Sequence, residues 1–176
     1  MKRNILVFGL ILGIILAAFG VFSMNMIYNN PNMETNDLFG YAVMVLIFSL
    51  VFFGIRNYRN KELGGVISFG RAFKVGALIV LVGSTLYVVV GLGYYHLFVP
   101  DFMEKWVEVV LNNAVSSGAT ESELAAKTEQ MEQFSNWFEN PFFAILLTYA
   151  EVLPIGLVVA LVSSLILKKN QKNNNN

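Results

Sequence analysis

The sequence predicts an all-α integral membrane protein: a four-helix bundle with an extracytoplasmic amphipathic helical hairpin between the third and fourth spanning helices. Hydrophobic residues make up 56% of its 176 residues and charged residues only 14%, whereas soluble domains carry about 25% charged residues. The apolar residues gather in four blocks, each near the roughly 20 residues that a helix needs to cross a bilayer. None of these blocks alternates like a membrane barrel strand, so helices are the expected spanning structure.

Four spanning helices are expected within a single membrane domain that covers residues 1–176. Their approximate limits are 5–27, 38–55, 74–99 and 141–167. Apart from Lys74 at the edge of the third span, Glu151 in the fourth is their one charged residue. The connections then comprise a loop at 56–73, the hairpin at 100–140 and a tail at 168–176.

The basic residues give the spans an orientation. Ten of the twelve Lys and Arg residues precede the first span, separate the second from the third, or follow the fourth. The positive-inside rule therefore places both termini, the 56–73 loop and the 168–176 tail in the cytoplasm of a multi-pass inner-membrane protein. A cleaved signal peptide remains an alternative for the first helix, although its apolar run exceeds the usual h-region of about 7–15 residues.

Four stretches of the sequence resemble a known family. They are YNNP at 28–31, FFGIRNYRNKELGGVISFGRAFKVG at 52–76, PDF at 100–102 and YAEVLPIGLVVALVSSLILKK at 149–169. Together they resemble the small bacterial membrane proteins grouped as domain-of-unknown-function family 4199. This resemblance implies a four-helix inner-membrane protein without an assigned activity, and it supplies no catalytic residue.

Small residues line one face of the first span and recur on the fourth. Gly9, Gly13 and Ala17 are spaced four residues apart, so they share a helix face that another backbone can approach closely. Gly156 and Ala160 repeat this spacing in the fourth span. These five residues are the candidate helix-packing positions. They serve either packing within the chain or packing between copies in a homo-oligomer.

The 100–140 segment predicts two amphipathic helices. The SSGA stretch interrupts the first helical pattern, and Thr120 then begins a T-x-x-E capping box with Glu123. The apolar positions of both helices fall on one side of the hairpin. The candidate residues of this apolar face are Phe102, Trp106, Met131, Phe134 and Phe138. Either the face lies on the bilayer or the bundle, or it docks a membrane or periplasmic protein partner.

Glu151 is the candidate intramembrane polar site, together with Tyr87 and Pro154. A charge at that depth costs at least about 2.5–3.5 kcal/mol on insertion scales, so we expect the side chain to face the bundle interior. No Lys or Arg at that depth can pair with it, and desolvation favours the neutral acid. A neutral acid can tie two helices by donating to the Tyr87 hydroxyl. The Ala150 carbonyl, which Pro154 leaves without its usual helical donor, is a second acceptor.

Other chemistries find little support in the sequence. The chain has no cysteine and one histidine, His96, which excludes thiolate chemistry and disfavours a zinc site. The GVISFGRA stretch at 65–72 nearly matches a phosphate-binding loop, but Arg71 and Ala72 replace its lysine and its hydroxyl residue. We therefore expect no enzyme, no catalytic, cofactor-binding or metal-binding residue, and no nucleic-acid partner. The lipid bilayer is the expected surrounding.

Two function classes remain open. The first is a non-enzymatic accessory or structural role that operates through helix packing and the extracytoplasmic hairpin. The second is a small proton-coupled transporter or carrier that uses Glu151. Transport paths usually show several ionisable residues or broken helices near the bilayer midplane. The four spans offer one acid and one proline in the same helix, so the accessory role is the favoured interpretation.

Overall fold

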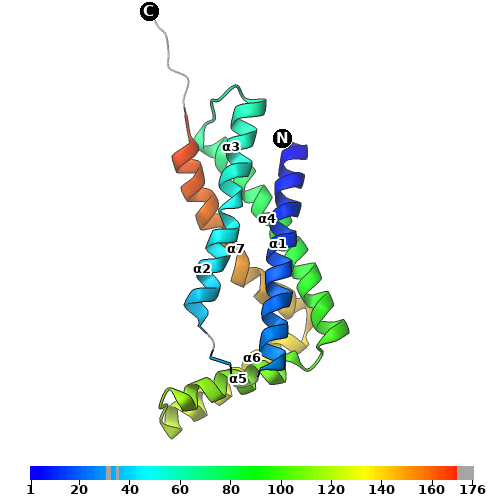
Figure 1. Ribbon diagram of the computed structural model, residues 1–176, viewed down its shortest axis with the longest axis vertical. Helices are drawn as coiled ribbons and strands as arrows, with labels where there is room; N and C mark the ends of the chain where they lie inside the picture. The colour runs from blue at the N-terminus through cyan, green and yellow to red at the C-terminus, as the bar shows by residue number, and fades with distance from the viewer. Residues whose placement is uncertain (31–32, 35, 170–176) are drawn as a thin grey trace, which may run out of the picture.

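The computed structural model describes residues 1–30, 33–34 and 36–169 of the chain (Figure 1). Within these residues the protein is all-helical, with 87% helix and no β-strand. In chain order its helices are α1 (Lys2–Asn29), α2 (Asp37–Phe48), α3 (Leu50–Glu62), α4 (Phe69–Phe98), α5 (Phe102–Ser116), α6 (Glu121–Glu139) and α7 (Pro141–Leu167). The predicted fold class is therefore confirmed at the level of helical content.

Four helical segments are long and apolar enough to cross a membrane: Lys2–Asn29, Leu38–Glu62, Phe69–Phe98 and Pro141–Leu167. The second segment combines α2 and α3, which meet at Ser49. The Ser49 hydroxyl donates to the carbonyl of Leu46 at 2.6 Å, a local bond that competes with the helical ladder and favours a bend. The sequence does not predict this interruption, because one serine in an apolar run leaves the periodicity unchanged.

The connection between α3 and α4 is shorter than the expected loop at 56–73. Helix α3 continues to Glu62 and α4 begins at Phe69, so the non-helical connection covers residues 63–68. One reason is that Tyr58, beyond the last apolar run, is buried at 3% exposure. It belongs to the main core, a cluster of buried side chains from the spanning helices that includes Leu12, Phe48, Val80 and Val152. Gly64 and Gly65 then reverse the chain at φ values of 63° and 89°, a conformation that favours glycine.

Helix α4 is the centre of the packing, with α1 and α7 as its principal neighbours (Figure 1). A Cβ atom built on Gly13 of α1 would lie 2.8 Å from the Cβ of Leu86 and 2.9 Å from the carbonyl oxygen of Gly83. A Cβ on Gly9 would similarly lie 2.7 Å from Val82. Side chains larger than hydrogen would therefore force α1 away from α4. The predicted small-residue face of α1 packs within the chain at these positions, and Ala17 beside it is buried.

The small residues of α7 also face neighbouring helices of the same chain. A Cβ on Gly156 would lie 2.5 Å from Val80 of α4 and 2.6 Å from the Phe48 ring of α2. Ala160 is fully buried, and its methyl group lies opposite Gly76 of α4. These contacts place α7 against α4 and against the junction of α2 with α3.

One end of the spanning helices, which we call the basic end, carries the N-terminus, the α3–α4 connection and the end of α7 (Figure 1). The backbones of Ile67 and Lys169 exchange two hydrogen bonds there, of 3.1 and 2.9 Å. The Arg59 Nη1 also donates to the last helical carbonyl of α7, that of Leu167, at 3.1 Å. A cation at this position complements the negative end of the helix dipole. The stretch at 65–72, which nearly matches a phosphate-binding loop, thus contains a turn whose backbone is hydrogen-bonded to the residues that follow α7.

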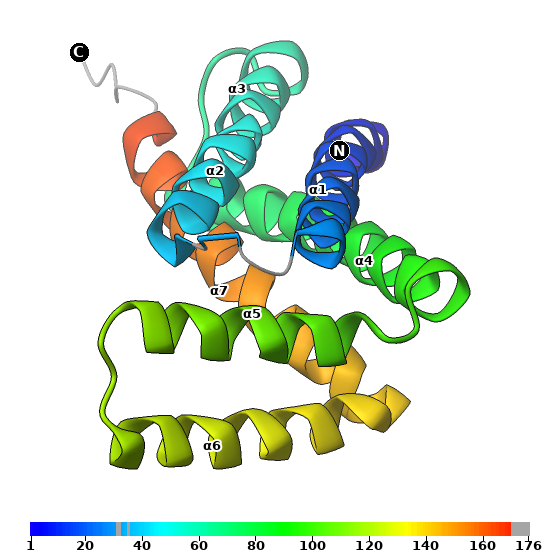
Figure 2. The ribbon, with the colours of Figure 1, turned by 60° about the horizontal axis from the view of Figure 1, so that its bottom comes forward.

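Helices α5 and α6 lie side by side across the opposite end, which we call the acidic end (Figures 1 and 2). Gly118, at φ 81°, stands in the turn between them. The predicted capping box is present, since Thr120 accepts from the backbone of Glu123 while Glu123 accepts from the backbone of Thr120. This cap starts α6 directly after the turn, which allows the two helices to run antiparallel.

Candidate functional site

The α5–α6 layer is held to the spanning helices by a second apolar cluster, separate from the main core. Its buried members are Tyr95, Val99, Phe102 and Met103. Trp106 and Phe134 join it, with ring centroids 5.5 Å apart. Phe138 of α6 lies edge-on to Tyr95 of α4 at a centroid distance of 5.4 Å. These aromatic contacts join both helices of the layer to the end of α4.

The structure brings most of the predicted hairpin face together. Phe102, Trp106, Phe134 and Phe138 belong to the second apolar cluster, in which Phe102 is buried and the other three are half-buried. Met131 is also buried, at 7% exposure. These side chains therefore lie against other parts of the chain in the structure, instead of forming an open apolar surface.

Two polar contacts that the sequence does not predict add to the attachment of the layer. The Tyr28 hydroxyl of α1 donates to Asp101 Oδ1, directly before α5, at 2.9 Å. A further bond, from the Asn25 side chain to the Tyr94 hydroxyl at 2.6 Å, joins α1 to α4 at the same end. Asn113 of α5 donates to the carbonyl of Met33 at 3.1 Å. Tyr28 and Asp101 belong to the YNNP and PDF stretches, on which the family resemblance was identified. The resemblance marked both segments, but it did not predict that their side chains contact each other.

The surface of the layer is strongly acidic. Between residues 101 and 139 the sequence has eight acids and two lysines, Lys105 and Lys127. Hydrogen bonds from the backbone and the hydroxyl of Thr120 hold the pKa of Glu123 below its usual range. Seven of the acids are exposed, namely Glu104, Glu108, Glu121, Glu123, Glu129, Glu132 and Glu139. The layer thus combines an apolar attachment with an acidic outer surface.

Glu151 occupies a different environment from the one expected. Its side chain is exposed in the structure, whereas Val152 next to it is fully buried. The main buried face of α7 passes through Val152, Gly156 and Ala160, and at about 100° per residue Glu151 lies to one side of this face. Glu151 therefore lies off the main buried face of α7, although neighbouring atoms still desolvate its carboxyl group. The position of the acid alone does not reveal this side of α7, whereas the small residues Gly156 and Ala160 mark the side that packs on α4.

Tyr87 lies within electrostatic range of the Glu151 carboxyl group. The Tyr87 ring packs on α1, where a Cβ built on Gly20 would lie 2.6 Å from the ring. In the described part of the chain, however, no hydrogen bond joins the Tyr87 hydroxyl to the Glu151 carboxylate. Helix α7 runs through Pro154 without ending. The structure therefore places Glu151 and Tyr87 near each other, but without the expected hydrogen bond between them in the part of the chain it describes.

The polar contact between α4 and α7 comes instead from two residues that the sequence analysis missed. The Tyr149 hydroxyl donates to Thr85 Oγ1 at 2.8 Å, and the Thr85 hydroxyl donates to the carbonyl of Leu81 at 2.7 Å. Ser84 beside Thr85 is fully buried, and its hydroxyl has no hydrogen-bond partner among the described residues. Polar groups of α4 and α7 thus gather at neighbouring levels of these helices, with Glu151 as their one acid.

The comparisons with known proteins place the chain in a family. No curated protein and no solved structure matches it. A family model described as "Protein of unknown function (DUF4199)" matches residues 7–169, which includes all four spanning segments except the first residues of α1. The match also contains the four stretches on which the resemblance was identified. The chain therefore belongs to the DUF4199 family.

Proposed function

We propose that this protein is a non-enzymatic accessory protein of the inner membrane. In this proposal the four spanning segments form one bundle that holds the α5–α6 layer outside the cytoplasm, where its acidic surface meets a membrane or periplasmic protein. The bundle thus acts as a support, and the layer acts as the binding element.

The orientation in this proposal rests on the basic residues. The basic end carries Lys2, Arg3, Arg56, Arg59, Lys61, Arg71, Lys74, Lys168 and Lys169. A cytoplasmic position for these side chains follows the positive-inside rule. Because α5 and α6 lie at the opposite end (Figure 1), the same rule puts their acids outside.

The observation that carries the proposal is the attachment of the layer. The apolar residues of the layer pack against Tyr95 and Val99 at the end of α4, whereas seven of its eight acids remain exposed. A loop that only connected two spans would not need a separate apolar cluster and two polar contacts to fix its position. A fixed charged surface instead favours recognition of a partner with complementary charge.

Photocrosslinking in intact cells tests this function. A photoreactive side chain at Glu132, on the exposed surface of α6, is expected to form a defined adduct with one protein. The same side chain at Asn60, exposed at the basic end, is the matched control and should not form that adduct. If neither Glu132 nor Glu108 of α5 yields an adduct above the level of Asn60, the accessory role through this layer is refuted.

A small proton-coupled carrier is the second candidate function. It is favoured by the exposed position of Glu151 beside Tyr87, since an acid at membrane depth usually faces a partner or a water-filled path. The polar side chains of Ser84 and Thr85 in α4 support the same interpretation. Against it, Glu151 is the one acidic or basic side chain at this depth.

Substitution of Glu151 separates the two candidates. Because no hydrogen bond among the described residues depends on its carboxylate, we expect Glu151→Gln to change the free energy of unfolding by less than about 0.5 kcal/mol. The adduct from Glu132 should form unchanged in this variant. Glu151→Leu should be at least as stable as the parent, because leucine avoids an insertion cost of about 2.5–3.5 kcal/mol. If a folded Glu151→Gln protein instead lost the Glu132 adduct, ionisation of Glu151 would be essential, which would favour the carrier.

A further inference from the structure

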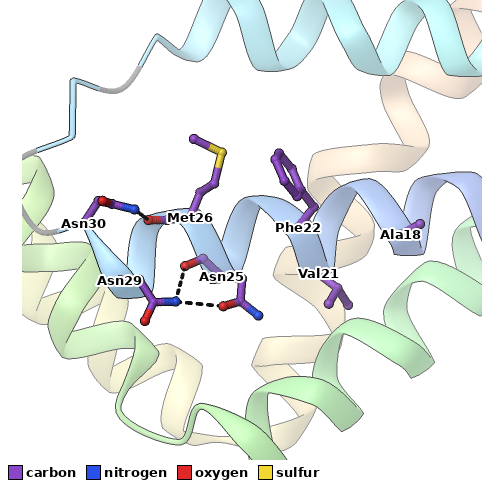
Figure 3. A pocket seen from close by; sticks show the side chains of 7 residues that line it. All are labelled: Ala18, Val21, Phe22, Asn25, Met26, Asn29 and Asn30. Carbon is purple, nitrogen blue, oxygen red and sulfur yellow. Dashed lines mark hydrogen bonds between the residues drawn. The ribbon is translucent and has the colours of Figure 1, made fainter.

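A shallow groove of about 460 Å³ runs along the part of α1 that approaches the acidic end (Figure 3). Its lining changes character along the helix axis. The part nearer the middle of the span is apolar, and the part at the end of α1 is formed by amides. The lining residues are Ala18, Val21, Phe22, Asn25, Met26, Asn29 and Asn30.

The amides of the groove are held in position by hydrogen bonds. Asn29 Nδ2 donates to both the backbone oxygen and Oδ1 of Asn25 at 2.8 Å (Figure 3), and Asn30 Nδ2 donates to the Met26 carbonyl at 2.8 Å. Asn25 is itself fixed by its bond to Tyr94. Within the described residues, the Oδ1 atoms of Asn29 and Asn30 accept no hydrogen bond. The groove therefore ends in two fixed acceptors that can receive further donors.

The charges around this end of α1 favour a cation. The connection from Asn29 to Asp37 contains no Lys or Arg, and the Asp101 carboxylate accepts from Tyr28 one residue before Asn29. The exposed acids of α5 and α6 lie at the same end. A head group with a net negative charge would be repelled here, whereas the ammonium group of a zwitterionic head group would be attracted and could donate to amide oxygens.

We propose that this groove binds one phospholipid with an ammonium head group, of the phosphatidylethanolamine class. Its acyl chain lies along Ala18, Phe22 and Met26, and its ammonium group donates to the oxygens of Asn29 and Asn30. The side chains of Phe22 and Met26 are 61% and 40% exposed, which leaves their apolar surface to the hydrocarbon of the bilayer. The lipid belongs to the leaflet at the acidic end, whichever way the protein is oriented, so the inference does not depend on the accessory function.

Lipid photocrosslinking tests this site. The full-length protein with a photoreactive side chain at Met26 is placed in vesicles of equal parts phosphatidylethanolamine and phosphatidylglycerol, irradiated, and analysed for lipid adducts by mass spectrometry. The control carries the same side chain at Leu146, which is 53% exposed near the acidic end of α7. We expect the ratio of ethanolamine to glycerol adducts at Met26 to exceed the control ratio about fivefold, equivalent to about 1 kcal/mol.

A second variant tests the role of the amides. Asn29→Leu combined with Asn30→Leu removes both acceptors. Among the described residues these side chains make hydrogen bonds only to residues of α1, so the fold should persist. The Met26 ratio should then fall to that of Leu146. Equal ratios at Met26 and Leu146 in the parent protein would overturn the site. A raised ratio that survives loss of both amides would overturn the assigned recognition.

Discussion

Replacing Trp106 and Phe134 together with aspartate is expected to release α5 and α6 from the spanning helices. The two rings lie 5.5 Å apart and pack on the cluster of Tyr95, Val99 and Phe102. Truncation of one such aromatic side chain typically costs about 3–5 kcal/mol, and a carboxylate in an apolar site adds a desolvation penalty. The exposed turn at Ser117 should then be cleaved at least about tenfold faster by a non-specific protease, since each 1.4 kcal/mol is a factor of ten.

The measurement is limited proteolysis of the protein in lipid nanodiscs, with the disappearance of the full-length band followed over time. Trp137→Asp is the matched control, because this side chain is 52% exposed on the same helix. Its cleavage rate should remain near that of the parent protein. If the Trp106 and Phe134 double variant were cleaved no faster than the Trp137 variant, the layer would not be held by this cluster.

Gly13→Leu is expected to separate α1 from α4 and to destabilise the protein strongly. Even a Cβ at this position would lie 2.9 Å from the Gly83 carbonyl oxygen and 2.8 Å from the Leu86 Cβ, which are not flexible side-chain ends. Overpacking of this kind costs about 1–3 kcal/mol, occasionally more. The corresponding change at Gly91 of α4 is the control, since nothing lies within 4 Å of its added Cβ.

Denaturation in mixed detergent micelles, followed by helical circular dichroism, measures this difference. The Gly13 variant should unfold at a clearly lower denaturant fraction, and the Gly91 variant within about 0.5 kcal/mol of the parent protein. Equal stabilities of the two variants would contradict the close approach of α1 and α4.

Much of the fold could be predicted because membrane helices leave strong local signals. Long uncharged runs predicted the four spanning segments, and the Thr120–Glu123 capping box predicted the start of α6. The repeat of small residues also marked the faces of α1 and α7 that pack on α4. Each of these features depends on residues close together in the sequence, so a pattern is sufficient to identify it.

The features that were missed depend on residues far apart in the sequence or on backbone detail. The contact of Tyr28 with Asp101 joins two segments separated by 73 positions, and Arg59 reaches the carbonyl of Leu167 over 108 positions. Hydropathy does not reveal the side of α7 on which Glu151 lies, although Gly156 and Ala160 mark the side that packs on α4. A uniformly apolar helix has no polar face to mark its packed side.

The orientation of the α5–α6 layer is the central claim, and single-cysteine labelling tests it most directly. The sequence contains no cysteine, so Ser117→Cys and Asn60→Cys each provide one thiol at an exposed position. In intact cells an impermeant maleimide should label position 117 and should label position 60 only after permeabilisation. Labelling of position 60 from outside, with position 117 protected, would contradict the account.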